Sequence, residues 1–263
     1  MLRIGINGAA GRMGQRLVAL VRAAEDLQLV LALEAESHPL LGRDAGEAAG
    51  IGALGVPISA TIAAQPDVLI DFSSPASTAL RARQCAKIGS ALVIGTTGLL
   101  PDQAAIVKDA ARAVPVVYAA NMSVGVNVLT KLVREAAAAL GPDFDIEIVE
   151  AHHRFKKDAP SGTAVQLARA AADGLQRKLD DVAVYGRHGL TGERPPQEIG
   201  IHAIRAGDII GEHTVLFGAL GEQVKLQHSA HSRDTFARGA LRAARFVAGK
   251  KPGLYSMKDV LGI

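Results

Sequence analysis

The feature that most restricts the fold is a glycine-rich turn near the N-terminus. Gly8, Gly11 and Gly14 follow the aliphatic run Leu2–Asn7, and apolar residues then recur at helical spacing over residues 13–24. Glycines at a strand-to-helix junction permit a tight turn and let the backbone approach a pyrophosphate closely. Its negative charge then meets free N–H groups at the start of the helix. The pattern predicts a β–α unit that binds a dinucleotide.

An acidic residue downstream supports this interpretation. Leu27–Leu33 is typical of a second buried strand, and it is followed by Glu34, 20 residues after Gly14. A carboxylate at this place binds ribose hydroxyls in dinucleotide sites. The spacing is G-x-x-G-x-x-G rather than the usual G-x-G-x-x-G, so the glycines alone would also fit a plain connecting turn. We favour the dinucleotide site because strand, glycines, helix, second strand and acid agree.

The rest of the first half alternates strands with helices. Val68–Phe72, Ala91–Gly95 and Val116–Ala119 are expected to be strands, and Pro75–Ile88 and Pro101–Ala113 to be helices. Strands that alternate with crossover helices form a parallel, doubly wound sheet. The first half is therefore predicted to be a Rossmann-type α/β domain.

The pattern changes after Asn121, and a second α+β domain with a mixed or antiparallel sheet is predicted. Asp145–His152 alternates, with Glu150 and His152 on the same side as two isoleucines. The other expected elements are a helix over residues 129–140, a helix from Ser161 to about Leu179, a loop over Gly186–Gly200, strands at Ile201–Arg205, His213–Phe217 and Gln223–His228, and a last helix at Thr235–Ala248 capped by Ser232. The three strands are expected to form an antiparallel meander. We assign residues 1–123 and 233–263 to a dinucleotide-binding domain and residues 124–232 to a substrate-binding and oligomerisation domain.

Composition excludes several classes of protein. A net charge of only +3 over 263 residues does not indicate nucleic-acid binding, and Arg81, Arg83 and Lys87 are interpreted as a solvated helix face. The single cysteine, Cys85, cannot form an intrachain disulfide and fits a reducing compartment. No apolar run is long enough to span a membrane, and the N-terminal apolar stretch breaks too early for a signal peptide. We expect a cytoplasmic protein that binds neither membrane nor nucleic acid.

Two further segments are expected at the carboxyl ends of strands, where ligands bind in open α/β sheets. In Gly95–Gly98, the small residues and the hydroxyls of Thr96 and Thr97 would let a nicotinamide approach and could hydrogen-bond a substrate. Ala119–Ser123 could line the same crevice. A plain turn is the alternative for the first of these segments.

The segment from Glu150 to Ala164 is the richest in chemistry. His152, His153 and Lys156 can donate protons or bind carboxylates. Ser161, Gly162 and Thr163 begin a helix and offer amides and hydroxyls to an anion. This combination suits a small carboxylate substrate.

Three other interpretations of this segment stay open at this point. The two histidines could bind metal, but consecutive strand residues point to opposite faces and no cysteine cluster joins them, so we expect no metal. The basic run could be solvated surface. Ser161 could serve only as a helix cap, although capping and ligand binding use the same amides.

Several motifs in order resemble the 4-hydroxy-tetrahydrodipicolinate reductase (dihydrodipicolinate reductase) family over essentially the whole chain. They are the stretches Gly8–Gly14, Gly95–Gly98, Glu150–Arg154 with Lys156, Asp158–Ala164, Arg187 with Gly192–Arg194, Arg205–His213 and His231–Ala237. The resemblance implies NAD(P)H-dependent reduction of 4-hydroxy-tetrahydrodipicolinate to tetrahydrodipicolinate in lysine and diaminopimelate biosynthesis. It also implies a homotetramer, which would cover the exposed edges of the second sheet.

The resemblance implies a role for each matching residue. His152 would be the proton donor and acceptor and Lys156 the second donor, while the substrate dicarboxylate would be bound by His153, Ser161, Gly162, Thr163 and Thr97. The cofactor would be bound by Gly8, Ala9, Ala10, Gly11, Arg12, Met13, Glu34, Gly95, Thr96, Thr97, Ala119, Ala120, Asn121 and Met122. Some relatives carry arginine where this chain has Ala35. Without that cation the carboxylate of Glu34 should disfavour a 2′-phosphate, so we expect NADH to be preferred over NADPH.

Two other functions fit parts of the sequence. One is another two-domain dehydrogenase, for example one that acts on an amino-acid semialdehyde; the substrate dependence of NADH oxidation separates it. The other is a redox-sensing protein that binds NADH without turnover. Such a sensor usually needs a module that binds DNA or a partner, and the sequence contains no recognisable one.

Overall fold

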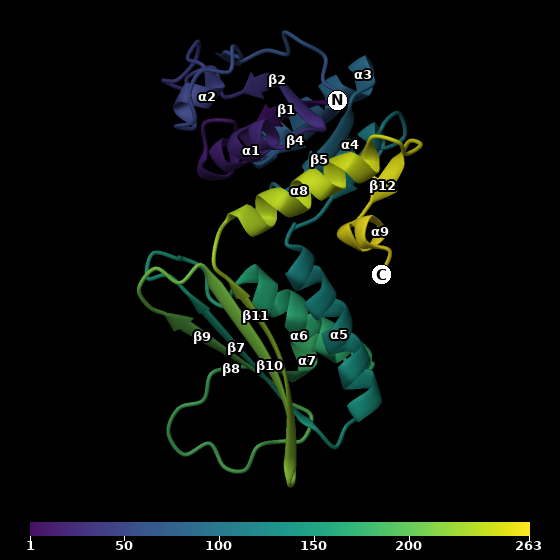
Figure 1. The fold of residues 1–263 in the computed structure, drawn as a ribbon. Coiled ribbons are helices and arrows are strands. Elements are labelled where there is room, and N and C mark those ends of the chain that lie inside the picture. Colours follow the sequence, from purple (N-terminus) through teal and green to yellow (C-terminus); the bar gives the residue numbers. More distant parts are fainter. The chain divides into compact units, whose positions relative to one another are not determined.

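A computed structural model describes residues 1–263, and the chain divides into two compact units. The first unit contains Met1–Val124 and Arg233–Ile263, and the second contains Gly125–Ser232. Figure 1 shows the elements of both units along the chain. None of the helices combines the length and the hydropathy that a membrane span requires.

The first unit is built on a parallel sheet of seven strands in the order β12-β6-β5-β4-β1-β2-β3. Its strands are β1 (Leu2–Asn7), β2 (Leu27–Leu33), β3 (Ile58–Ser59), β4 (Val68–Asp71), β5 (Ala91–Ile94), β6 (Pro115–Tyr118) and β12 (Gly253–Tyr255). Its helices are α1 (Arg12–Ala23), α2 (Ala45–Ala48), α3 (Pro75–Ile88), α4 (Pro101–Ala110), α8 (Asp234–Val247) and α9 (Met257–Leu261). The predicted Rossmann-type sheet is confirmed. The direction of winding reverses between β1 and β4, where such sheets bind ligands.

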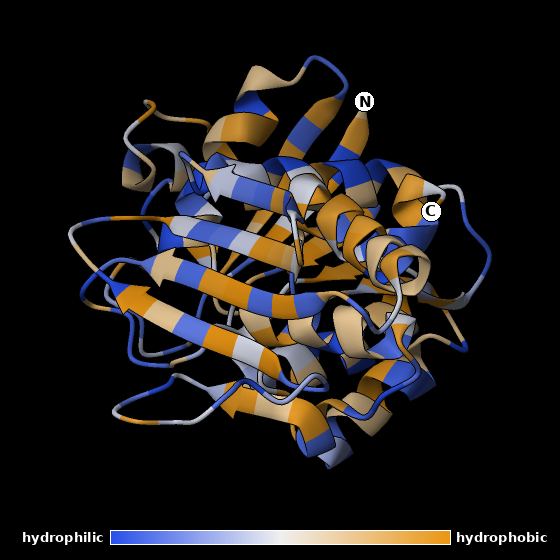
Figure 2. Ribbon diagram, turned by 90° about the horizontal axis from the view of Figure 1, so that it is seen from below, coloured by the Kyte–Doolittle hydropathy of each residue, from blue (hydrophilic) through white to orange (hydrophobic).

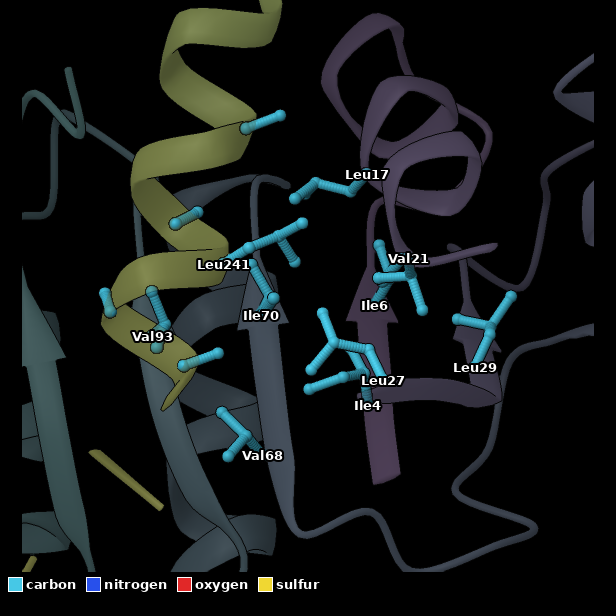
Figure 3. Close-up of a cluster of buried hydrophobic side chains, with 14 of the residues drawn as sticks. Ile4, Ile6, Leu17, Val21, Leu27, Leu29, Val68, Ile70, Val93 and Leu241 are labelled. Atoms are coloured by element: carbon cyan, nitrogen blue, oxygen red, sulfur yellow. The ribbon is translucent and has the colours of Figure 1, made fainter. Parts of the chain in front are cut away.

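Helices cover both faces of this sheet. On one face, Leu17 and Val21 of α1 and Leu241 of α8 pack against Ile4 and Ile70 of the sheet, as Figure 3 shows. On the other face, α3 and α4 pack against β4 and β5. Each fully buried aliphatic side chain contributes roughly 1.5–3 kcal/mol. These aliphatic layers fix the strands, so the loops at their carboxyl ends start from rigid positions.

The second unit has a mixed sheet of five strands in the order β11-β10-β7-β9-β8. The strands are β7 (Asp145–His152), β8 (Ala183–Tyr185), β9 (Ile199–Arg205), β10 (Gly211–Ala219) and β11 (Glu222–Ala230), and the helices are α5 (Val124–Leu140), α6 (Gly162–Gly174) and α7 (Leu179–Val182). Helices α5 and α6 pack on one face of the sheet. Figure 2 shows the alternation of hydrophilic and hydrophobic residues along these strands, as expected for a sheet with one covered face.

Apart from element ends that shift by up to five residues, four predicted details differ from the structure. The antiparallel meander is wrong, because β9 pairs in parallel with β7, which lies between β9 and β10; only β10 and β11 form a hairpin. The helix from Ser161 ends at Gly174, and Leu179 begins the separate helix α7. Arg233 rather than Ser232 is the N-cap of α8.

The fourth difference concerns Arg81, which the charge pattern places on a solvated face. Arg81 is 5% exposed, and its guanidinium donates to the carbonyl oxygen of Ala60 at 2.8 Å and to Oε1 of Gln84 at 2.8 Å. Its Nε also lies 3.4 Å from Oδ1 of Asn7, at the end of β1. Periodicity marks the buried stripe of a helix, but it does not show that a long cation can lie in that stripe when a backbone oxygen and side-chain oxygens accept its hydrogen bonds.

Candidate active site

The glycine turn in the first unit needs glycine for steric reasons. Gly8 has φ +81°, and a Cβ at this position would lie 2.5 Å from the carbonyl oxygen of Phe72. A Cβ at Gly14 would collide with the carbonyl oxygen of Gly8 and with the backbone of Ala9. Any side chain at either position would therefore push the turn away from β4 or from the start of α1.

The start of α1 is open to an anion. Gly11 occupies the N-cap position and provides no side-chain cap, and the first intrahelical bond runs from the amide of Gln15 to the carbonyl of Gly11. The amides of Arg12 and Met13 therefore have no intrahelical acceptor. Gly11 and Arg12 are exposed. These free donors at the positive end of a helix suit a pyrophosphate.

Glu34 lies directly after β2 and reaches the glycine turn. Its Oε1 accepts a hydrogen bond from the amide of Ala10 at 2.9 Å, and its Oε2 accepts one from the amide of Ala35 at 3.3 Å. The carboxylate and the turn thus lie side by side at the carboxyl ends of β1 and β2. This arrangement matches the acid and the phosphate-binding loop of a dinucleotide site.

The other predicted cofactor segments follow β5 and β6, on the same edge of the sheet. Thr96 is buried, and its Oγ1 accepts a hydrogen bond from the amide of Ser73 at 3.0 Å, whereas Thr97 is exposed. A Cβ at Gly95 would meet the ring of Phe72. Residues 119–122 follow β6, and the amide of Ala119 donates to the carbonyl of Ile94. The structure thus brings all predicted cofactor residues to the carboxyl ends of the parallel strands in the first unit.

A buried carboxylate that the sequence analysis did not single out holds the loops at these strand ends together. Asp71 is fully buried at the end of β4, and its Oδ1 accepts from Nδ2 of Asn7 at 3.1 Å and from Oγ of Ser73 at 2.6 Å. Burial raises the pKa of Asp71, against the hydrogen bonds that lower it. In the sequence, the signal for this residue was an aspartate at the end of an otherwise aliphatic strand. The Asp71 carboxylate links the loops that follow β1, β4 and β5.

In the second unit, the carboxyl end of β7 carries a buried polar cluster. His152 and Glu150 lie on the covered face, and Nδ1 of His152 lies 2.6 Å from Oε2 of Glu150. Strand register places Arg205 of β9 beside His152, and His213 of β10 beside Glu150. The guanidinium of Arg205 donates to both carboxylate oxygens of Glu150, at 2.9 and 2.8 Å. The result is an acid–base cluster assembled from three strands.

The start of α6 joins this cluster. The amide of Ser161 donates to Oε1 of Glu150 at 3.0 Å, and its Oγ accepts from the amide of Ala164 at 3.2 Å. The Oγ also lies 3.3 Å from Nε2 of His213. Gly162 is exposed, and a Cβ there would meet nothing within 4 Å. The predicted helix cap is thus correct, and the backbone beside it is open to a ligand.

The remaining predicted residues lie in the turn between β7 and α6. Nζ of Lys156 is 2.9 Å from Oδ1 of Asp158, and the lysine side chain is 21% exposed. His153 is half-buried, and its Nδ1 is buried with no hydrogen-bond partner. His152, His153, Lys156, Ser161, Gly162 and Thr163 therefore lie within the one segment that joins β7 to α6, whereas Thr97 belongs to the first unit.

Burial and charge set the protonation of the imidazoles. Burial lowers the pKa of His152; Glu150 works in the opposite direction, and Lys156 and Arg205 add to the lowering. Burial, together with the neighbouring imidazoles of His152 and His228, lowers the pKa of His213 to about 4. His213 is therefore neutral near pH 7. No group of three or more His, Cys, Asp or Glu side chains is placed to hold a metal ion.

Comparison with known proteins gives a consistent result along the chain. The family models described as dihydrodipicolinate reductase, N-terminus, and dihydrodipicolinate reductase, C-terminus, match residues 2–122 and 125–261. A 4-hydroxy-tetrahydrodipicolinate reductase of Citrifermentans bemidjiense is 50% identical over 266 aligned positions, which cover 100% of both chains. One from Anaeromyxobacter sp. is 53% identical, with 100% of this chain and 98% of the relative covered.

A solved structure agrees with these matches. The dihydrodipicolinate reductase of Paenisporosarcina sp. TG-14, solved with dipicolinate bound, superposes with a TM-score of 0.77 at 27% identity and covers 98% of this chain and 99% of its own. Both halves of the sequence and the fold therefore lead to one assignment. The chain belongs to the dihydrodipicolinate reductase family, whose members are pyridine-nucleotide-dependent oxidoreductases of lysine biosynthesis.

Proposed function

We propose that the protein reduces 4-hydroxy-tetrahydrodipicolinate to tetrahydrodipicolinate with NADH as the preferred cofactor, and that His152 and Lys156 handle the protons. The observation that carries the proposal is the cluster at the end of β7, where an imidazole oriented by a buried carboxylate adjoins the open start of a helix. Its cytoplasmic location is part of the proposal, since the only cysteine, Cys85, is free.

The first unit has the features that a dinucleotide requires, and we assign cofactor binding to residues 1–123 and 233–263. The glycine positions 8 and 14 keep the turn close to the sheet, and the uncapped amides at the start of α1 suit the pyrophosphate. Glu34 would hydrogen-bond ribose hydroxyls, and Gly95–Thr97 and Ala119–Met122 would adjoin the nicotinamide. When bound, the reduced nicotinamide supplies hydride to the substrate.

NADH preference rests on charge. The carboxylate of Glu34 lies at the glycine turn, and Ala35 beside it carries no charge. A 2′-phosphate at the ribose would approach this carboxylate with no cation at the position after it to neutralise either group, and like charges at close range disfavour binding.

We assign substrate binding to residues 124–232. Gly162 and Thr163 at the start of α6, with His153, would bind the two carboxylates, because the amides of a helix N-terminus and an imidazole N–H can donate hydrogen bonds to anions. Ser161 shapes this helix start, and Thr97 is proposed to contribute a hydroxyl to the substrate. The relative solved with dipicolinate, a dicarboxylate, supports this substrate class.

Two groups can supply protons in this arrangement. Nε2 of His152 makes no hydrogen bond within the chain, so it can exchange a proton with the substrate. Lys156 pairs with Asp158, which is largely exposed, and its ammonium could turn to a carboxylate or to the leaving hydroxyl. One of these two groups would protonate the hydroxyl that leaves the ring as water. His152 or Lys156 would also donate a proton to the substrate after the hydride has been transferred.

Self-association as a homotetramer completes the proposal. The sheet face away from α5 and α6 carries partly exposed apolar residues, including Val149 at 36% and Ile204 at 47%. A sheet face of this kind requires a cover. A second copy that packs this face on itself would supply one, and light scattering that gave a monomer would contradict it.

A spectrophotometric assay tests the function. NADH oxidation is followed at 340 nm while an upstream synthase generates the substrate in situ, with NADPH in a parallel reaction. Oxidation that depends on the synthase supports the proposal. NADH binding without oxidation would instead support a sensor, and oxidation driven by an amino-acid semialdehyde would support a different dehydrogenase.

A further inference from the structure

Glu150 differs from most carboxylates of the chain, because it is fully buried and has four hydrogen bonds to three residues. Oε1 accepts from Arg205 at 2.8 Å and from the amide of Ser161 at 3.0 Å. Oε2 accepts from Arg205 at 2.9 Å and lies 2.6 Å from Nδ1 of His152. A buried carboxylate is tolerated as an anion only when it is paired and hydrogen-bonded in this way.

These partners keep Glu150 ionised. Burial works to raise its pKa, but Arg205, His152 and the Ser161 amide outweigh burial, and the pKa lies below the ordinary value. An ionised carboxylate has no hydrogen to donate and can only accept. Nδ1 of His152 must therefore carry the hydrogen of the short contact. In neutral His152 the lone pair is then on Nε2.

The surroundings of His152 leave Nε2 as the ring nitrogen that can exchange a proton with a ligand. No protein atom hydrogen-bonds to it, and the side chain of His152 is 11% exposed. Gly211 lies beside it, and a Cβ at that position would be 3.1 Å from Nε2. The charged and titratable groups around His152 are Glu150 on its own strand, Arg205 on β9, His213 on β10 and Lys156 in the following turn. Of these groups, only Glu150 makes a hydrogen bond with the ring.

We propose that Glu150 is the positioning residue of this site: held as an anion by Arg205, it fixes the hydrogen of His152 on Nδ1 and, through the Ser161 amide, fixes the start of α6. One carboxylate thus orients the helix end proposed to bind the substrate and the His152 ring, which donates from Nε2 once that nitrogen has taken up a proton. The inference rests on the proposed function, because it assigns the proton transfer to Nε2 of His152. Arg205 affects His152 indirectly, because its guanidinium keeps Glu150 ionised.

The position of the hydrogen tests the first part directly and needs no variant. A neutron structure of the unaltered protein at about pH 7.5 shows deuterium on histidine and on carboxyl groups. Deuterium on Nδ1 of His152, with none on Glu150, is the expected result. Deuterium on the Glu150 carboxyl, or a bare Nδ1, would overturn the inference whether or not the protein reduces the proposed substrate.

Kinetics of Glu150→Gln tests the second part. A glutamine amide can donate to Nδ1 and so select the wrong tautomer, and a comparable change in other enzymes costs several orders of magnitude. We expect kcat to fall about 10²- to 10⁴-fold, the KM for NADH to stay unchanged, and the pH limb of His152 to move to lower pH. Retention of kcat within about threefold would refute a positioning role.

A matched variant separates this role from a loss of folding. Glu147→Gln removes another arginine-paired carboxylate from β7, but one on the opposite face from His152. It is expected to leave the hydrogen position and the pH limb of His152 unchanged; a shift as large as that in Glu150→Gln would count against the inference. If Glu150→Gln does not fold, the neutron result alone decides. If the unaltered protein did not oxidise NADH, the proposed function would be rejected. The neutron result on the hydrogen at Nδ1 of His152 would still decide the inference about Glu150.

Discussion

Oε1 of Glu34 accepts a hydrogen bond from the backbone amide of Ala10 at 2.9 Å, which ties the acid after β2 to the glycine turn after β1. The two residues are 24 positions apart in the chain, and the parallel pairing of β1 with β2 brings them together. This relationship places a negative charge where the ribose of a dinucleotide is expected. Cofactor preference therefore depends on whether a cation stands nearby.

Ala35→Arg should shift the preference toward NADPH. The new guanidinium could pair with a 2′-phosphate and offset the charge of Glu34, so we expect kcat/KM for NADPH to rise about tenfold relative to NADH. Ser37→Arg, which places the same charge two residues further along, is the control and should change the ratio less. Equal kcat/KM for the two cofactors in the unaltered protein would contradict the expected NADH preference.

His152→Gln should damage chemistry and spare cofactor binding. The variant keeps a polar side chain but loses the proton donor, and general acid catalysis is typically worth about 10²- to 10⁴-fold. We expect kcat to fall by about that factor, with the Kd for NADH, measured by fluorescence titration, within about twofold. A variant that kept most of its kcat would remove His152 from the mechanism.

Lys156→Ala should affect both KM and kcat, because the ammonium is proposed to bind a substrate carboxylate and to donate a proton. Its neighbour Lys157 has no recorded ion pair and is exposed, so Lys157→Ala is the matched control. Steady-state kinetics with both variants checks the assignment. A rise in KM alone for Lys156→Ala would leave lysine as a binding residue and not an acid.

Acid should weaken the second unit through Glu147. Burial would raise its pKa, but hydrogen bonds from Arg187, His202 and Arg194 lower it from 4.5 to about 2. The lowered pKa contributes stability that is present above about pH 4.5 and is lost as the pH falls toward 2. The contribution is on the order of 3 kcal/mol before screening of the partly exposed partners.

Urea unfolding of the unaltered protein and of Glu147→Gln, at one protein concentration, measures this contribution. The difference in free energy of unfolding should be largest near pH 6 and should shrink toward pH 3. A difference that does not vary with pH would show that the Glu147 carboxylate is not held ionised by its partners.

The sequence was most informative where one segment determines its own structure. The bounds predicted for β1, β2 and α3 agree with the structure, because apolar periodicity, a proline at the first helical turn and the glycine turn are all local signals. The meander was wrong because alternation shows that a segment is a strand but not which strand it pairs with. The connection from β9 to β10 passes over the end of β7, which lies between them in the sheet. No local residue pattern predicts such a connection.

The same limit explains which site residues were missed. His152, His153, Lys156 and Ser161 are close in sequence, so their composition drew attention to them. Arg205 and His213 are more than 50 positions from Glu150 and His152, respectively, and only strand register brings them together. Glu150 itself occupied a predicted inward position two residues before His152. An acid at a core position of a strand was the signal for a buried partner.

The most direct test of the central claim is a crystal structure of the protein with NADH and pyridine-2,6-dicarboxylate. We predict that the dicarboxylate lies at the start of α6, against Gly162, Thr163 and His153, with Lys156 within hydrogen-bonding distance. A structure in which the dicarboxylate is ordered elsewhere, and the segment between β7 and α6 makes no contact with it, would contradict the account.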